Sequence, residues 1–136
     1  MPDGGLFTVS QLRKQSKDTV LDQTPERGAI EVKSPKENVS EVALGEQVTG
    51  YAQRYGLVLV TNLREFVLVK HISGEKTQIL EHNSLASDET SFWKMTHHSR
   101  IAVQQHGLRL MEFLKRALMY QAELTDPKDL AWFLAR

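Results

Sequence analysis

YGLVLVTNLREFVLVK, residues 55–70, is the stretch of sequence that decides the fold. Residues 57–62 (LVLVTN) begin with an uninterrupted apolar run, which is typical of a strand covered on both faces of a sheet. Residues 66–71 (FVLVKH) have a similar composition, and residues 63–65 are short enough to form a hairpin turn between the two runs. The stretch therefore predicts two neighbouring antiparallel strands.

A strand and a helix are expected on the N-terminal side of this hairpin. Residues 29–33 (AIEVK) have strand composition. Asn38 or Ser40 can cap a helix that runs to about Tyr55, where Gly56 stops it. The order strand, helix, buried strand is a crossover unit, so the sheet should contain a parallel pair. The helix should bury one stripe with the spacing i, i+3, i+4, i+7, made of Val48, Tyr51, Ala52 and Tyr55.

The remaining segments predict a small mixed sheet followed by helices. Residues 5–10 (GLFTVS) should form a short strand, residues 11–28 mostly a loop, and residues 77–80 another short strand after a turn at Ser73-Gly74. Ser87 should cap a helix over residues 88–96. The predicted fold class is α/β, a small mixed sheet with one crossover helix followed by an α-helical tail.

A long helix over residues 100–121 is expected next, and Asp126-Pro127 should open a last one. The long helix should pack on the sheet through Leu108, Met111, Leu114 and Leu118. Residues 1–82 are interpreted as an α/β core and residues 83–136 as a helical extension.

Composition places the chain among ordinary globular proteins. Its 136 residues suit one domain, and no apolar run approaches the ~20 residues needed to span a bilayer. The sequence contains no cysteine and does not begin like a secretory signal, which fits the reducing cytoplasm. Net charge is zero, but residues 91–119 carry five basic residues against one acid. That basic segment could face a polyanion such as DNA, through Arg109, Lys115 and Arg116.

Glu31 and Lys33 are the first candidates for chemistry. Alternation along a strand puts both side chains on one sheet face, about 6–7 Å apart. A carboxylate can hold a divalent ion that activates water toward a phosphodiester, and a lysine can stabilise the charge that develops. Magnesium prefers oxygen ligands and needs a second carboxylate. In isolation the triplet is common, and Asp126-Pro127-Lys128 fits the same pattern at a helix start.

Three neighbouring features support an interpretation as a metal-dependent nuclease. Pro2-Asp3 immediately precedes the first predicted strand and supplies a second carboxylate. Gln47 and Tyr51 lie one turn apart on the helix that follows the EVK strand, facing the site or a DNA backbone. A buried apolar strand then follows that helix.

With these residues in place, the chain resembles the PD-(D/E)xK nucleases, specifically the N-terminal region of long proteins that combine restriction with DNA-adenine methylation. YGLVLVTNLREFVLV is the most specific of the resembling segments. The others are PDGGLFTVSQL, ERGAIEVKSP, EQVTGYAQR, SFWKMTHHSR and LTDPKDLAWFLAR. The resemblance implies a magnesium-dependent DNA endonuclease whose catalytic set is Asp3, Glu31 and Lys33. Asp3 and Glu31 would hold the metal, with Gln47 and Tyr51 in support.

The same resemblance implies a fragment. Nucleases of this type carry a helix and a strand before the aspartate, and the methyltransferase expected downstream of residue 136 is missing from the sequence. No Asn-Pro-Pro-(Tyr/Phe) motif is present, so the chain should not methylate DNA by itself. Two alternatives remain open, a non-catalytic DNA-binding or scaffold domain and an inert fragment.

Asp18 is a rival to Asp3 as the metal-binding acid. If residues 18–23 formed a strand paired with residues 28–33, Asp18 would lie opposite Lys33 and Asp22 opposite Ala29. The histidine pair His97-His98, followed by His106, points to different sides of a helix. These histidines therefore favour an exposed helix end over a zinc site.

Overall fold

Strand β3 (Leu57–Thr61) is buried along its whole length at the centre of a five-stranded sheet. The computed structural model describes residues 1–13, 24–72, 77–120 and 135. The strand order follows the chain, and only β2 and β3 are parallel. The other four strands are β1 (Gly4–Leu6), β2 (Gly28–Val32), β4 (Glu65–Lys70) and β5 (Gln78–Ser84).

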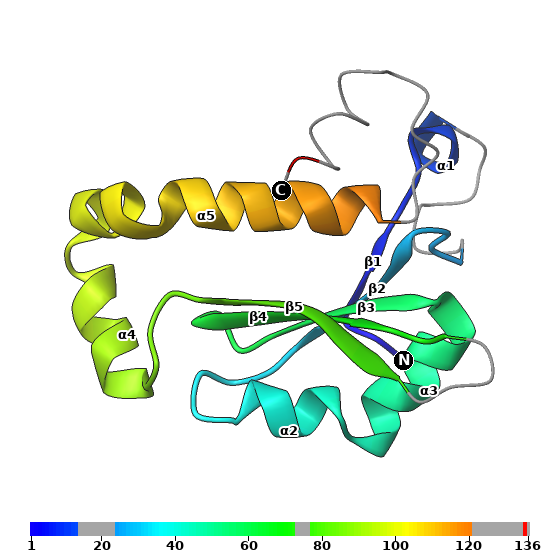
Figure 1. Ribbon diagram of the computed structural model, residues 1–136, viewed down its shortest axis with the longest axis horizontal. Coiled ribbons are helices and arrows are strands. Elements are labelled where there is room, and N and C mark those ends of the chain that lie inside the picture. The colour runs from blue at the N-terminus through cyan, green and yellow to red at the C-terminus, as the bar shows by residue number, and fades with distance from the viewer. Residues whose placement is uncertain (14–23, 73–76, 121–134, 136) are drawn as a thin grey trace.

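Helices cover the two faces of this sheet (Figure 1). The chain has the predicted α/β fold, with a helical crossover between the parallel strands β2 and β3 and a long helix at its C-terminal side. The described helices are α1 (Val9–Arg13), α2 (Val39–Ala43), α3 (Glu46–Tyr55), α4 (Glu89–Thr96) and α5 (Ser99–Met119).

Alternation along β3 and β4 divides the core into two layers. One layer lies under α2 and α3, and the other lies under α5 (Figure 1). In the first layer the valines of the hairpin meet the predicted stripe of the crossover, in which Val48 and Ala52 are fully buried and Tyr51 and Tyr55 pack at the margin. The second layer joins the leucines of the hairpin to α5 and contains Leu6, Leu57, Leu59, Leu68, Phe113 and Ala117.

Two glycines allow close approaches at the start of this sheet. Gly28 has a φ of 143°, and a Cβ built there would lie 2.6 Å from the carbonyl oxygen of Leu57. Gly56 has a φ of 84° and ends α3 immediately before β3. A side chain at either position would strain the backbone.

The crossover is two helices, whereas the sequence predicted one helix ending at Tyr55. Asn38, one of the two predicted caps, accepts hydrogen bonds from the backbone N–H groups of Ser40 and Glu41. The first helix ends after one turn because Gly45, in extended conformation, starts α3 as a new N-cap. Apolar periodicity does not reveal such a break, since both helices face the same layer of the core.

Four smaller expectations were also wrong. Strand β1 is shorter than residues 5–10, and α1 occupies part of the predicted loop because Thr8 and Gln11 bond reciprocally across its first turn. Strand β5 extends to Ser84, past residue 80. The cap of α4 is Asp88 and not Ser87, since the Asp88 carboxylate accepts the backbone N–H of Ser91 at 2.7 Å.

Helix α5 presents a different face to the sheet from the one expected. Leu108, Met111 and Leu118 are 74%, 66% and 45% exposed. Phe113 and Ala117 are buried in their place, with Leu114 at the edge. Helix α5 therefore has two apolar stripes. The stripe that packs against β3 and β4 is the one that contains Phe113.

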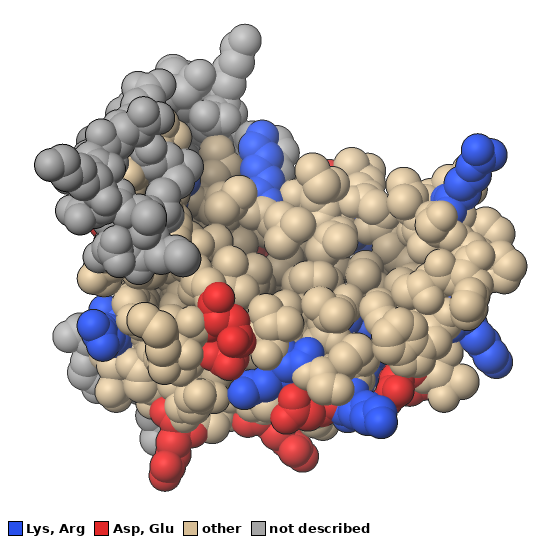
Figure 2. Space-filling model, turned by 180° about the vertical axis from the view of Figure 1, so that it is seen from behind, with Lys and Arg blue, Asp and Glu red and all other residues tan. Residues whose placement is uncertain are grey.

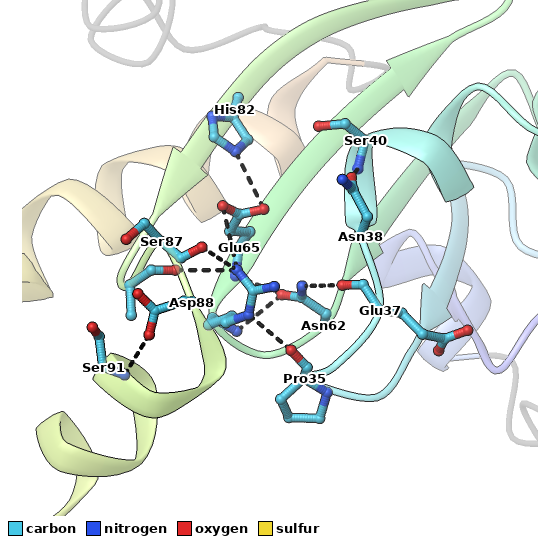
Figure 3. Close-up of polar contacts among 12 residues, drawn as sticks. Pro35, Glu37, Asn38, Ser40, Asn62, Glu65, His82, Ser87, Asp88 and Ser91 are labelled. Carbon is cyan, nitrogen blue, oxygen red and sulfur yellow. Dashed lines mark hydrogen bonds and ion pairs between the residues drawn. The ribbon is translucent and has the colours of Figure 1, made fainter.

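A buried arginine joins three loops at one end of the sheet (Figure 3). The Arg64 guanidinium donates to the backbone carbonyls of Pro35, Ala86 and Ser87 and lies 3.5 Å from a Glu65 carboxylate oxygen. Beside it, the buried Asn62 amide donates to the Glu37 carbonyl. These contacts fix the loop that follows β2 against the hairpin and the start of α4.

Several predicted features lie outside the described residues. They are Asp18 and Asp22, the turn at Ser73-Gly74, and Asp126-Pro127-Lys128 with its helix. Over the residues that are described, no helix is both long and apolar enough to cross a membrane.

Candidate active site

The end of β2 places Glu31 and Lys33 on the sheet face that α2 and α3 cover. Glu31 alternates with Ile30, which joins the layer under α5, and so shares its face with Ala29. The Lys33 Nζ atom lies 3.4 Å from the Glu31 Oε1 atom. The prediction that these two side chains share one face is confirmed, and the pair is a close ion pair.

Strand β1 brings the second carboxylate to the same place. Gly4 pairs with Ile30 in an antiparallel register, so the next residue outward, Asp3, lies beside Glu31. The Asp3 Oδ2 atom accepts a hydrogen bond of 2.8 Å from the backbone N–H of Val32. This backbone donor could not be read from side-chain patterns in the sequence, because it depends on the register of two strands.

Helix α3 adds Gln47 and Tyr51, the two side chains predicted to support the site. The Lys33 Nζ atom donates to the Gln47 Oε1 atom at 3.3 Å. The Gln47 amide nitrogen lies 3.3 Å from the Tyr51 hydroxyl, one turn further along the helix. One line of contacts therefore joins the β1–β2 pair to α3, and it links all five residues expected at the site: Asp3, Glu31, Lys33, Gln47 and Tyr51.

Electrostatics differ sharply between the two carboxyl groups. The backbone N–H of Val32 holds the pKa of Asp3 below its usual value. Burial raises the pKa of Glu31 above its usual value, and the neighbouring Asp3 carboxylate raises it further. The buried Glu31 Oε2 atom accepts no hydrogen bond from the described residues. A cation placed between Asp3 and Glu31 would reduce the repulsion between their carboxylates and would give the Glu31 Oε2 atom a partner.

The donor set fits a magnesium ion. Mg²⁺ is commonly held by one or two carboxylates and completes its octahedron with water and substrate phosphate oxygens. Asp3 and Glu31 supply two such carboxylates side by side, and Asp3 is exposed so that solvent and substrate can approach. Within the described part of the chain, no cluster of three or more His, Cys, Asp or Glu side chains could hold a metal. Any ion bound here would therefore keep several water ligands.

The three cations proposed for DNA contact are remote from this site. Arg109, Lys115 and Arg116 belong to α5, on the opposite side of the sheet from α3 (Figure 1). Arg116 is half-buried and its Nε atom donates to the Glu81 carboxylate on β5 at 2.7 Å. Arg116 is therefore engaged in an ion pair within the fold, and this contact competes with the predicted DNA contact. Arg109 and Lys115 are exposed.

Comparison of the chain with models of known families found no match, and neither curated proteins nor solved structures gave one.

Proposed function

We propose that this chain carries the active site of a magnesium-dependent DNA endonuclease, the nuclease part of a restriction–modification enzyme. One observation supports the proposal above the others. Asp3 and Glu31, which are 28 positions apart in the sequence, lie side by side with Lys33 in direct contact. Two carboxylates and a lysine in contact are the minimum set for phosphodiester hydrolysis assisted by one divalent ion.

Each protein group has a defined task in this proposal. Asp3 and Glu31 would bind Mg²⁺, which when present supplies a Lewis acid for the phosphodiester and lowers the pKa of a coordinated water. Lys33 would place its ammonium beside the phosphate and stabilise the negative charge that develops there. Gln47 holds that ammonium by accepting its N–H, and Tyr51 supports the Gln47 amide. Val32 fixes Asp3 through its backbone N–H.

The test is cleavage of double-stranded DNA in Mg²⁺ by the chain and by Lys33→Ala. Loss of one preorganised charge-stabilising group typically costs about 10²–10³ in rate. We expect a loss of that size with folding and DNA binding close to normal. Lys70→Ala is the matched control. Lys70 is also a half-buried lysine at the end of a strand, but it pairs with Leu57 at the start of β3, whereas Lys33 lies beside Thr61 at the end of β3. It should cleave like the unchanged chain.

Cleavage by Lys33→Ala at the full rate would contradict the catalytic role of the EVK strand. DNA binding by the unchanged chain without cleavage in either Mg²⁺ or Mn²⁺ would favour a non-catalytic binding domain. The restriction–modification context rests on the sequence resemblance, and an open reading frame for an adenine methyltransferase continuous with this chain would support it.

A further inference from the structure

Helix α5 carries a second apolar stripe that the fold leaves in solvent. Four large apolar side chains on it, Ile101, Leu108, Met111 and Leu118, are 52%, 74%, 66% and 45% exposed. Gln104 and Lys115 are exposed on the same line. Together the six positions are spaced by three and four residues in strict alternation, which is the a/d pattern of a coiled coil. We name this set the outer seam: Ile101, Gln104, Leu108, Met111, Lys115 and Leu118.

The outer seam lies opposite the side of α5 that packs on the sheet. At 100° per residue, Leu108 and Lys115 point about 140–180° away from Phe113 and Ala117, which are 1% and 2% exposed. Apolar residues at a/d spacing on the solvent side of a single helix remain exposed, whereas pairing with another helix buries them. Figure 2 shows acidic side chains mainly in the lower half of the face it presents, whereas basic side chains also project from the upper part, where α5 runs.

We propose that the outer seam pairs α5 with α5 of a second copy of this chain, in antiparallel orientation. With the twofold axis between Leu108 and Met111, each of these two residues faces the other in the second copy. Ile101 then meets Leu118 of the second copy, so apolar residues face apolar residues in every such layer. Gln104 meets Lys115 of the second copy, where the amide oxygen can accept from the ammonium group.

The polar pair selects this orientation. In a parallel pair each seam residue faces its own equivalent, so Lys115 would face Lys115 across the interface and the like charges would repel. In the antiparallel pair Gln104 of one copy shares a layer with Lys115 of the other, and no apolar residue is placed against a polar one. The two polar layers weaken the contact but fix its register.

The expected association is weak because the seam is short. A helix of 21 residues is about 31 Å long and 10 Å across, so pairing would bury roughly 600 Å² in total. Stable interfaces usually bury more than about 1,200 Å². We therefore expect a monomer–dimer equilibrium that appears only at high micromolar concentration. This inference does not depend on the proposed nuclease activity, because the active site lies on the other side of the sheet.

Sedimentation velocity over a rising concentration series tests the interface. The unchanged chain should shift from monomer toward dimer, and Leu108→Gln with Met111→Gln should remain monomeric. Val103→Gln is the matched control, since Val103 is 67% exposed on the same helix but lies off the seam. It should dimerise like the unchanged chain, and circular dichroism should show all variants folded. A dimer that survives the double substitution, or a chain that stays monomeric throughout, would overturn the proposal.

Cysteine cross-linking tests the orientation without interference, because the sequence contains no cysteine. Chains with Ile101→Cys and chains with Leu118→Cys should form a mixed disulfide dimer when combined. Each variant alone should give little product, because the antiparallel pair puts its cysteine opposite a leucine or isoleucine. Efficient cross-linking of Ile101→Cys chains alone would show a parallel pair and overturn the antiparallel arrangement.

Discussion

At the scale of single residues, Glu31 is a buried carboxyl group in unfavourable surroundings. It is 4% exposed, lies beside another carboxylate and has one oxygen without a donor among the described residues. Its raised pKa means that Glu31 holds its proton more strongly in the folded chain than in the unfolded chain. The stabilisation from that proton is present at low pH and is lost as the pH rises through the unfolded value of about 4.5 to the folded one. Raising the pH above about 4.5 therefore lowers the stability that Glu31 gives to the fold.

Glu31→Gln should consequently raise the midpoint of thermal unfolding at pH 7 in the presence of a chelator. The amide has nearly the same shape and no charge to bury. Added Mg²⁺ should raise the midpoint of the unchanged chain and leave that of Glu31→Gln where it is, because ligand binding to the folded state alone is stabilising. Glu41→Gln, on the exposed surface of α2, should behave as the unchanged chain in both conditions. Equal stabilisation of Glu31→Gln by Mg²⁺ would exclude Glu31 as a ligand.

Asp88 shows the opposite dependence on pH. The backbone N–H of Ser91 lowers the pKa of Asp88, so its cap stabilises the fold above the unfolded pKa of about 3.8. That stabilisation disappears as the pH falls through the lower, folded value. Asp88→Ala should lower the urea midpoint at pH 7, and its effect should become smaller as the pH falls below the unfolded pKa. Asp88→Asn should keep the cap and lose the pH dependence, and a pH-independent deficit in Asp88→Ala would contradict this assignment.

At the scale of secondary-structure elements, the sequence predicted which segments form strands and helices better than it predicted which face of a helix is buried. The hairpin and the crossover were predictable because buried strands and an amphipathic helix have distinct apolar periods. The inward face of α5 was not predictable, since two stripes compete on that helix and only the sheet decides between them. At the candidate site, the alternation of side chains along a strand was sufficient to predict that Glu31 and Lys33 share one sheet face. The contact of Asp3 with Val32 needed the register of β1 on β2, which local sequence does not encode.

The corrected face of α5 can be measured directly. Phe113→Ala should cost about 3–5 kcal/mol of unfolding free energy, because it leaves a cavity between α5 and the hairpin. Met111→Ala, which removes an exposed side chain two residues away, should change that free energy by no more than about 0.5 kcal/mol. Denaturant unfolding at low micromolar concentration, where the outer seam is unpaired, separates the two. A larger cost at Met111 would restore the originally expected face.

At the scale of the whole molecule, the two proposed sites lie on opposite sides of the sheet. The candidate active-site residues lie on the side of α3, and the outer seam points away from the sheet on the far side of α5 (Figure 1). DNA bound at Asp3 and Glu31 would lie across the ends of β1 and β2. Arg109 and Lys115 would then be separated from it by the sheet, which favours a solvated surface over phosphate contact for these cations.

Salt dependence of DNA binding decides which cations meet phosphate. Each phosphate contact contributes about −0.9 to the slope of log K against log salt concentration. Lys36 follows Lys33 by three residues and is exposed, so it lies within about 11 Å of the site along the chain. Lys36→Gln should flatten the slope by roughly 0.9 on any DNA sequence, whereas Arg109→Gln should leave it unchanged. Arg116→Gln is unsuitable because it breaks the ion pair with Glu81 and disturbs the packing of α5. If Arg109→Gln flattened the slope and Lys36→Gln did not, DNA would bind along α5, and the carboxylates on the other face could not be the cleavage site for that DNA.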